Sequence, residues 1–206
     1  MLIRRNDSLL LVIDIQEKLA PQIHDTETVT RNAVRLIEGA RMLDVPTFVS
    51  EQYVKGLGPS VAEIRNAASR EIENSATIET NAGPRTIEAD AGRTVNPKFF
   101  EKTHFSCAAE PGVIDLLRQA GRPQIIIAGS ETHVCVLQSA LGLLGAGFEV
   151  FLVADAASSR TPENRQAAIN RMQTAGVGIV TTEMVLFEWL HKAGTDTFRA
   201  LLPLIK

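Results

Sequence analysis

Three side chains of this sequence could together perform acyl transfer: the carboxylate of Asp14, the ammonium of Lys102 and the thiol of Cys135. A thiol that attacks a carbonyl needs a base to take its proton, a cation to stabilise the thiolate, and N–H donors to hold the oxyanion. Each residue also has an ordinary interpretation, as a turn-capping Asp, a surface Lys or a small buried Cys. The chemistry therefore depends on whether the fold brings the three together.

Cys135 follows a predicted strand and stands at the start of a predicted helix. The apolar run 124–128 ends at Gly129 and predicts a strand buried on both faces, and apolar residues at helical spacing follow over 136–144. A helix N-terminus and a nearby lysine lower a thiol pKa, whereas a nearby carboxylate raises it. The sequence leaves open which of these effects prevails at Cys135.

Asp14 and Lys102 lie at the ends of two other predicted strands. Residues 8–14 are an apolar run that ends at Asp14, and the run from Lys98 to Lys102 contains two phenylalanines. Ligands of open α/β sheets bind beyond the carboxyl ends of the strands, which places both residues where a ligand would be expected. Cys107, close behind the second run, is expected to pack rather than react.

The wall of a pocket at this edge is predicted from three further residues. Tyr53 lies in a glycine-rich loop after the predicted strand 45–51, and His104 and Phe105 follow Lys102. Loops at the carboxyl edge of a sheet often carry binding residues, but they can equally be plain connections.

Strands and helices alternate along the chain, and this order predicts the α/β class, a doubly wound three-layer sandwich with a mainly parallel sheet. We expect one domain over residues 1–206, with a small insertion at about 69–97 that contains a hairpin. Further elements are expected at 148–155 and 177–182 (strands) and at 26–43, 111–120, 162–175, 183–191 and 196–205 (helices).

Composition excludes several classes of function. The net charge of −3 comes without a basic cluster, and no apolar stretch reaches the roughly 20 residues of a membrane span, so neither nucleic acid nor membrane is expected as a partner. The two cysteines fit neither a disulfide framework nor a zinc site. We therefore expect a cytoplasmic protein that acts on a small molecule.

Three segments resemble the isochorismatase-like cysteine hydrolases, a superfamily that includes nicotinamidases and carbamoylsarcosine amidases. They are Leu11–Gln16, Glu101–Ser106 and Gly129–Val136. Within this superfamily the chain most resembles the isochorismatase-domain-containing proteins, through Glu51–Tyr53 and through residues 154–160.

The resemblance implies a six-stranded parallel sheet and a catalytic triad of Asp14, Lys102 and Cys135. It also implies a cis peptide bond between Ser130 and Glu131, which would aim the N–H groups of Glu131 and Cys135 at one oxyanion. No cofactor is implied, and no metal is expected because Glu51–Tyr53 replaces the Asp-x-His pair of metal-dependent nicotinamidases. A homo-oligomer, dimeric or larger, is expected.

The predicted function is hydrolysis of a small amide or related acyl compound through a covalent acyl-enzyme on Cys135. Two alternatives on the same fold remain open. One is a non-catalytic binding or assembly module, and the other is a redox-active thiol protein in which Cys107 folds close to Cys135. The sequence does not identify the substrate.

Overall fold

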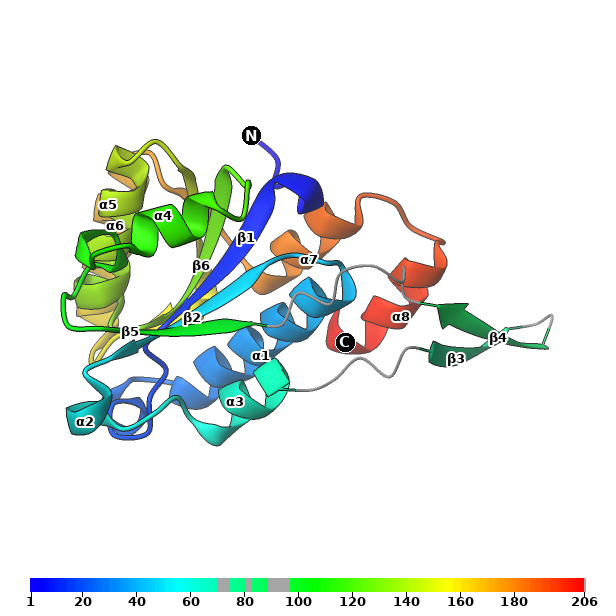
Figure 1. The fold of residues 1–206 in the computed structure, drawn as a ribbon, viewed down its shortest axis with the longest axis horizontal. Helices are drawn as coiled ribbons and strands as arrows, with labels where there is room; N and C mark the ends of the chain where they lie inside the picture. Colours follow the sequence, from blue (N-terminus) through cyan, green and yellow to red (C-terminus); the bar gives the residue numbers. More distant parts are fainter. Residues whose placement is uncertain (70–74, 81–82, 89–96, 206) are drawn as a thin grey trace.

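A six-stranded sheet forms the centre of the protein in a computed structural model, which describes residues 1–69, 75–80, 83–88 and 97–205. All of its neighbouring strands pair in parallel, in the order β5-β2-β1-β6-β7-β8. The predicted α/β class and the six-stranded sheet are confirmed (Figure 1). The strands are β1 (Ser8–Ile13), β2 (Thr47–Gln52), β5 (Lys98–Lys102), β6 (Gln124–Ser130), β7 (Glu149–Ser158) and β8 (Gly178–Val180).

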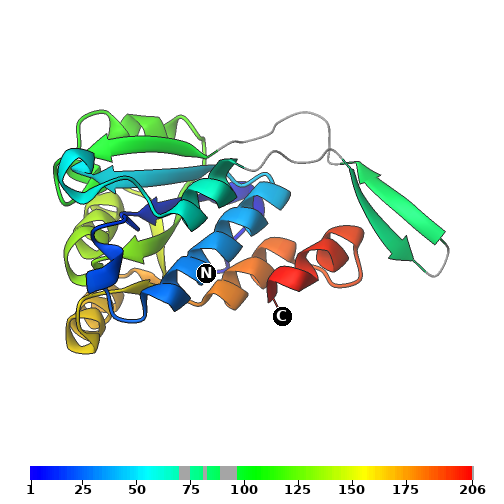
Figure 2. The ribbon, with the colours of Figure 1, turned by 90° about the horizontal axis from the view of Figure 1, so that it is seen from below.

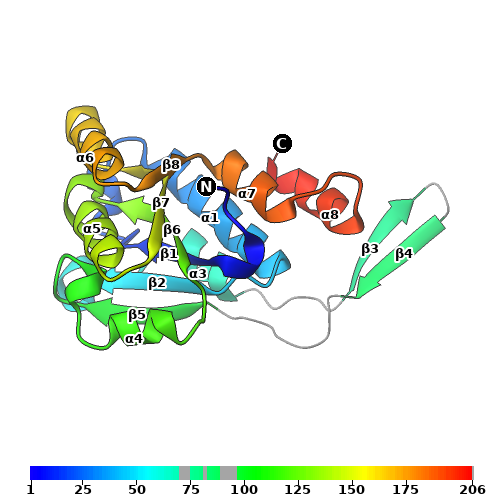
Figure 3. The same cartoon turned by 90° about the horizontal axis from the view of Figure 1, so that it is seen from above.

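Helices cover both faces of this sheet, as Figures 1 and 3 show. One face packs against α1 (Thr26–Met42), α3 (Ala62–Ser69), α7 (Thr182–Leu190) and α8 (Asp196–Ile205). The other face packs against α4 (Val113–Arg118), α5 (Leu137–Gly145) and α6 (Pro162–Thr174). The two central strands, β1 and β6, are buried along their whole length, because side chains that alternate between faces meet helices on both sides. The catalytic candidates therefore project from a rigid frame.

Gly129, near the end of β6, permits the close approach of β6 to β1. Its φ of 142° is unfavourable for other residues, and a Cβ atom there would lie 2.1 Å from the carbonyl oxygen of Ile13. Only glycine therefore allows the two strand ends to pair, and Asp14 directly follows Ile13.

The predicted insertion contains a two-stranded antiparallel sheet, β3 (Ser75–Thr80) and β4 (Gly83–Glu88), that pairs with no other strand of the described residues. Figure 2 shows this hairpin projecting from the layered body. The predicted hairpin is confirmed, whereas residues 70–74, 81–82 and 89–96 of the insertion lie outside the described residues. Two helices that were not predicted, α2 (Val54–Leu57) and α3, follow β2.

Among the described residues, every helix is too short or too polar to cross a lipid bilayer.

Candidate active site

Asp14 and Lys102 form a buried ion pair at the carboxyl edge of the sheet. The Lys102 Nζ atom lies 2.7 Å from Asp14 Oδ2, and both side chains are 0% exposed. Ser50, in β2, donates a hydrogen bond of 2.7 Å to Asp14 Oδ1. Burial raises the pKa of Asp14, although Lys102 and Ser50 both oppose that change.

Three further oxygen atoms surround the Lys102 ammonium. Gln52 Oε1 lies 2.6 Å from Nζ, and the backbone oxygens of His104 and Phe105 lie at 3.3 and 3.2 Å. A buried ammonium is costly unless each of its N–H groups has an acceptor, and these groups supply them. The fold thus accommodates a charged lysine where sequence statistics favour a surface residue.

Cys135 lies in η4 (Thr132–Val136), a single π-helical turn that leads into α5, and it is 4% exposed. Its thiol lies close enough to the Asp14 carboxylate for the two groups to shift each other's pKa. Burial raises the pKa of Cys135, Asp14 raises it further, and Lys102 opposes both. The balance that the sequence left open is therefore decided by burial, which favours the protonated thiol.

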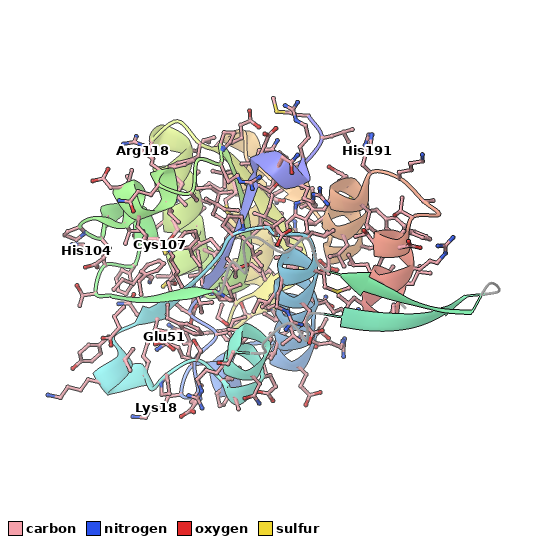
Figure 4. The ribbon with its side chains drawn as sticks, turned by 45° about the vertical axis from the view of Figure 1, so that its right-hand side comes forward. Lys18, Glu51, His104, Cys107, Arg118 and His191 are labelled. Carbon is pink, nitrogen blue, oxygen red and sulfur yellow. The ribbon has the colours of Figure 1, made fainter. Side chains whose placement is uncertain are left out.

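Cys107 lies fully buried beside this group. Its backbone N–H donates to Ser139 Oγ at 2.8 Å, and the hydroxyl groups of Ser139 and Ser50 lie close enough to its thiol to lower the pKa. Burial, helped by the Asp14 charge, raises the pKa of Cys107 to about 11. The expectation that this cysteine packs in the interior is confirmed, and Figure 4 shows it well inside the molecule.

The predicted cis peptide bond between Ser130 and Glu131 is absent, because no peptide bond in the described part of the chain is cis. The chain turns at this point through a left-handed backbone conformation of Glu131, with φ 57° and ψ 59°. The Glu131 carbonyl then accepts hydrogen bonds from the N–H groups of Val134 and Val136, at 2.9 and 3.3 Å. A trans bond followed by this conformation starts the turn that carries Cys135.

Left-handed backbone recurs where the strands of the site end. Asp14 after β1 has φ 53°, and Tyr53 after β2 has φ 39°. Such conformations are unfavourable for residues other than glycine, mildly so for Asp, and they cluster at functional sites. At both positions the left-handed residue ends the strand and contacts Lys102.

The Glu131 side chain has partners that the sequence did not reveal. Its carboxylate, 4% exposed, accepts a hydrogen bond of 2.6 Å from Arg160 Nε and lies 3.3 Å from His133 Nδ1. The ion pair joins η4 to the loop after β7. An arginine after a predicted strand was visible in the sequence, but the identity of its partner was not.

The three predicted pocket residues lie around Lys102 with their side chains at the surface. Tyr53 is 54% exposed and Phe105 is 55% exposed. The ring of His104 contacts Glu110 at 2.9 Å, and Figure 4 shows this histidine at the outer edge of the molecule. Tyr53 N–H donates to the Lys102 carbonyl, so these residues meet the site through their backbones. Their role in binding a substrate stays a prediction.

In the part of the chain that the structure describes, no three His, Cys, Asp or Glu residues gather in the manner of a metal site.

Comparison with known proteins places this geometry in a family. The sequence profile of the isochorismatase domain matches residues 8–184. The chain belongs to the isochorismatase family. Isochorismatase domain-containing protein 2 of Danio rerio is 35% identical over 199 residues, which are 96% of this chain and 86% of that protein. Isochorismatase family protein 1A of Dictyostelium discoideum is 35% identical over 202 residues, 97% of this chain and 86% of the relative.

Two solved structures share the fold of this chain. A Caenorhabditis elegans protein described as MAR1 ribonuclease superposes with a TM-score of 0.81 at 32% identity. The alignment covers 100% of this chain and 92% of the C. elegans chain. The YcaC gene product of Escherichia coli, described as an octameric hydrolase of unknown specificity, gives a TM-score of 0.81 at 22% identity. That alignment covers 99% of this chain and 90% of YcaC. The protein thus has the hydrolase fold of the isochorismatase family.

Proposed function

We propose that this isochorismatase-family protein is a cysteine hydrolase that cleaves a small amide or a related acyl compound without a cofactor. One observation carries the proposal: the Asp14 carboxylate contacts the Lys102 ammonium at 2.7 Å and lies close enough to the Cys135 thiol to shift its pKa. A carboxylate in that position can take the thiol proton, while the ammonium can stabilise the negative charge that remains.

The reaction begins with a protonated thiol. Asp14 takes the proton from Cys135 as the sulfur attacks the substrate carbonyl, and a C–S bond forms. We propose the backbone N–H groups of Glu131 and Cys135 as donors to the oxyanion, presented by the turn that follows the trans bond before Glu131. The C–N bond then breaks, and the leaving amine receives the proton held by Asp14. Water attacks the thioester and gives a proton to Asp14, the C–S bond breaks to release the acid, and the proton returns to the sulfur.

The burial of Cys135 favours a small substrate, because at 4% exposure the thiol is open only to a slender group. Two hollows, of about 710 and 980 Å³, lie elsewhere: one between α1, α3 and α8, and the other between the N-terminus and α7. Neither is lined by Asp14, Lys102 or Cys135. A substrate would instead approach over the edge where Tyr53 and Phe105 are exposed.

A screen of small amides for ammonia release tests the proposal, with Cys135→Ala as the control. We expect wild-type protein to release ammonia from at least one amide and Cys135→Ala to release none. Rapid quenching should trap an adduct on Cys135 whose added mass equals the acyl group. Ammonia release that Cys135→Ala retains would show that the activity does not use this thiol.

The redox alternative has one observation in its favour, namely that Cys107 lies close enough to Cys135 to raise the pKa of the Cys135 thiol. The raised pKa of both thiols weighs against it, because oxidants react with thiolates. In a non-catalytic module, the buried ion pair of Asp14 and Lys102 would have no part in any reaction. For RNA cleavage, the activity named for the C. elegans relative, a net charge of −3 is unfavourable, because phosphates are bound by basic residues. RNA belongs in the screen as a substrate that we expect to remain intact.

We also propose a homo-oligomer, since the related YcaC is described as octameric. Light scattering of the purified protein measures the state directly, and a monomer would contradict this proposal.

A further inference from the structure

The second short contact of the Lys102 ammonium is with an uncharged group, the side-chain amide of Gln52. Gln52 is the last residue of β2 and is 7% exposed. Its Oε1 atom lies 2.6 Å from Lys102 Nζ, while Asp14 Oδ2 lies at 2.7 Å and the two backbone oxygens lie beyond 3 Å. An ammonium has three N–H groups, so Asp14 and Gln52 together fix its direction.

The orientation of the Gln52 amide is fixed by its own hydrogen bonds. Its Nε2 donates to the carbonyl of Thr103 at 2.8 Å, in the loop that follows Lys102. A flipped amide would place N–H groups against the ammonium and an oxygen against that carbonyl, and both contacts would become repulsive. The oxygen of Gln52 is therefore held toward Lys102.

A second buried glutamine holds the backbone of the first. Gln16 Oε1 accepts the Gln52 N–H at 2.7 Å, and Gln16 Nε2 donates to the Gln52 carbonyl at 2.9 Å. The same Nε2 donates to the Gly58 carbonyl at 2.6 Å, and the Gln16 side chain is 0% exposed. Gln16 lies two residues after Asp14, so the two glutamines connect the ends of β1 and β2 to Lys102 at the end of β5.

We propose that Gln52, held by Gln16, is a positioning residue that directs the Lys102 ammonium toward Asp14 and Cys135. This inference rests on the proposed function, because it assigns the ammonium a part in the chemistry of the thiol. An apolar side chain at this position would remove the shortest contact of the buried ammonium and leave it, besides Asp14, only the backbone oxygens of His104 and Phe105 beyond 3 Å. A carboxylate would keep an acceptor for the ammonium but would add negative charge beside Lys102 and weaken the support that the ammonium gives to a thiolate. A neutral oxygen avoids both costs.

The test is the rate at which iodoacetamide labels Cys135, followed by mass spectrometry at several pH values around neutrality. Gln52→Glu keeps the shape and an acceptor oxygen, yet it should label about tenfold more slowly than wild type, the effect of one pKa unit. Gln52→Leu should also label more slowly. Gln124→Leu is the matched control, since Gln124 is a buried glutamine at the start of β6 with hydrogen bonds to Arg4 and Glu149. It should label at the wild-type rate.

The outcomes separate this inference from the proposed function. Wild-type labelling in both Gln52 variants, with slow labelling in Lys102→Met, would overturn the role of Gln52 and leave the triad intact. Wild-type labelling in Lys102→Met as well would overturn both. If Gln52→Leu fails to fold, the nearly isosteric Gln52→Glu decides the question. Its melting temperature is measured in parallel, because a carboxylate oxygen would also face the Thr103 carbonyl.

Discussion

Replacement of Asp14 by Asn should weaken the fold and make Cys135 more acidic at the same time. The variant leaves the buried Lys102 ammonium without a counter-ion at 2.7 Å, and breaking a buried ion pair costs about 3–5 kcal/mol. Asn retains an acceptor oxygen, so we expect the free energy of unfolding to fall by about 3 kcal/mol, the lower end of this range. For a protein of this size, that loss lowers the melting temperature by about 6–12 °C.

The same substitution removes a negative charge that raises the pKa of Cys135, and it leaves the opposing charge of Lys102 unpaired. At an effective dielectric constant of about 20, charges about 5 Å apart interact by about 3 kcal/mol, and solvent screening reduces this to a shift of about 1–2 pKa units. Iodoacetamide labelling of Cys135 should therefore begin at a lower pH than in wild type. Amide turnover should nevertheless disappear, since the proton acceptor is gone.

Calorimetry and the pH dependence of labelling measure the two effects. Asp196→Asn is the matched control, because it breaks a surface pair with Arg199 at 2.6 Å whose side chains are half exposed. Surface pairs contribute about 0–1 kcal/mol, so its melting temperature should change little. A labelling profile of Asp14→Asn that coincides with wild type, or moves to higher pH, would refute the electrostatic coupling between Asp14 and the thiol.

Two further predictions concern buried parts of the site. Because burial holds the pKa of Cys107 near 11 against an ordinary value of 9.0, the unfolded chain ionises first, and Cys107 should lower wild-type stability by about 2–3 kcal/mol between these pH values, in addition to the fall that Cys135 causes. Urea unfolding of Cys107→Ala should show a smaller fall, and equal falls would contradict the assignment. Gly129→Ala should lower the free energy of unfolding by at least about 3 kcal/mol, because its new Cβ would lie 2.1 Å from the carbonyl oxygen of Ile13. Gly147→Ala is the control, because Gly147 also has a positive φ, of 90°, but has open space around it. Its free energy of unfolding should fall by about 1–2 kcal/mol, and a similar fall in both variants would refute the clash.

The sequence by itself determined the fold class and the edge at which the chemistry gathers. Apolar runs over 8–14 and 124–128 predict buried strands because their residues leave no polar face for water, and the structure has β1 and β6 there. Reactive side chains directly after such runs must lie at the carboxyl edge of a parallel sheet. The periodicity of one segment is enough for each of these inferences. Helix α3 was missed because it spans only 8 residues, which is too short a segment to display the helical period clearly.

Only the tertiary structure decided the state of the site. The partner of Lys102 lies 88 positions away at Asp14, and Gln52 contacts the lysine from 50 positions away. No local pattern encodes contacts between strand ends so distant in the chain. The trans peptide before Glu131 and the raised pKa of Cys135 were likewise beyond local patterns. A thiol pKa depends on how completely water is excluded and on which charges remain nearby, and both are properties of the assembled layers rather than of any segment.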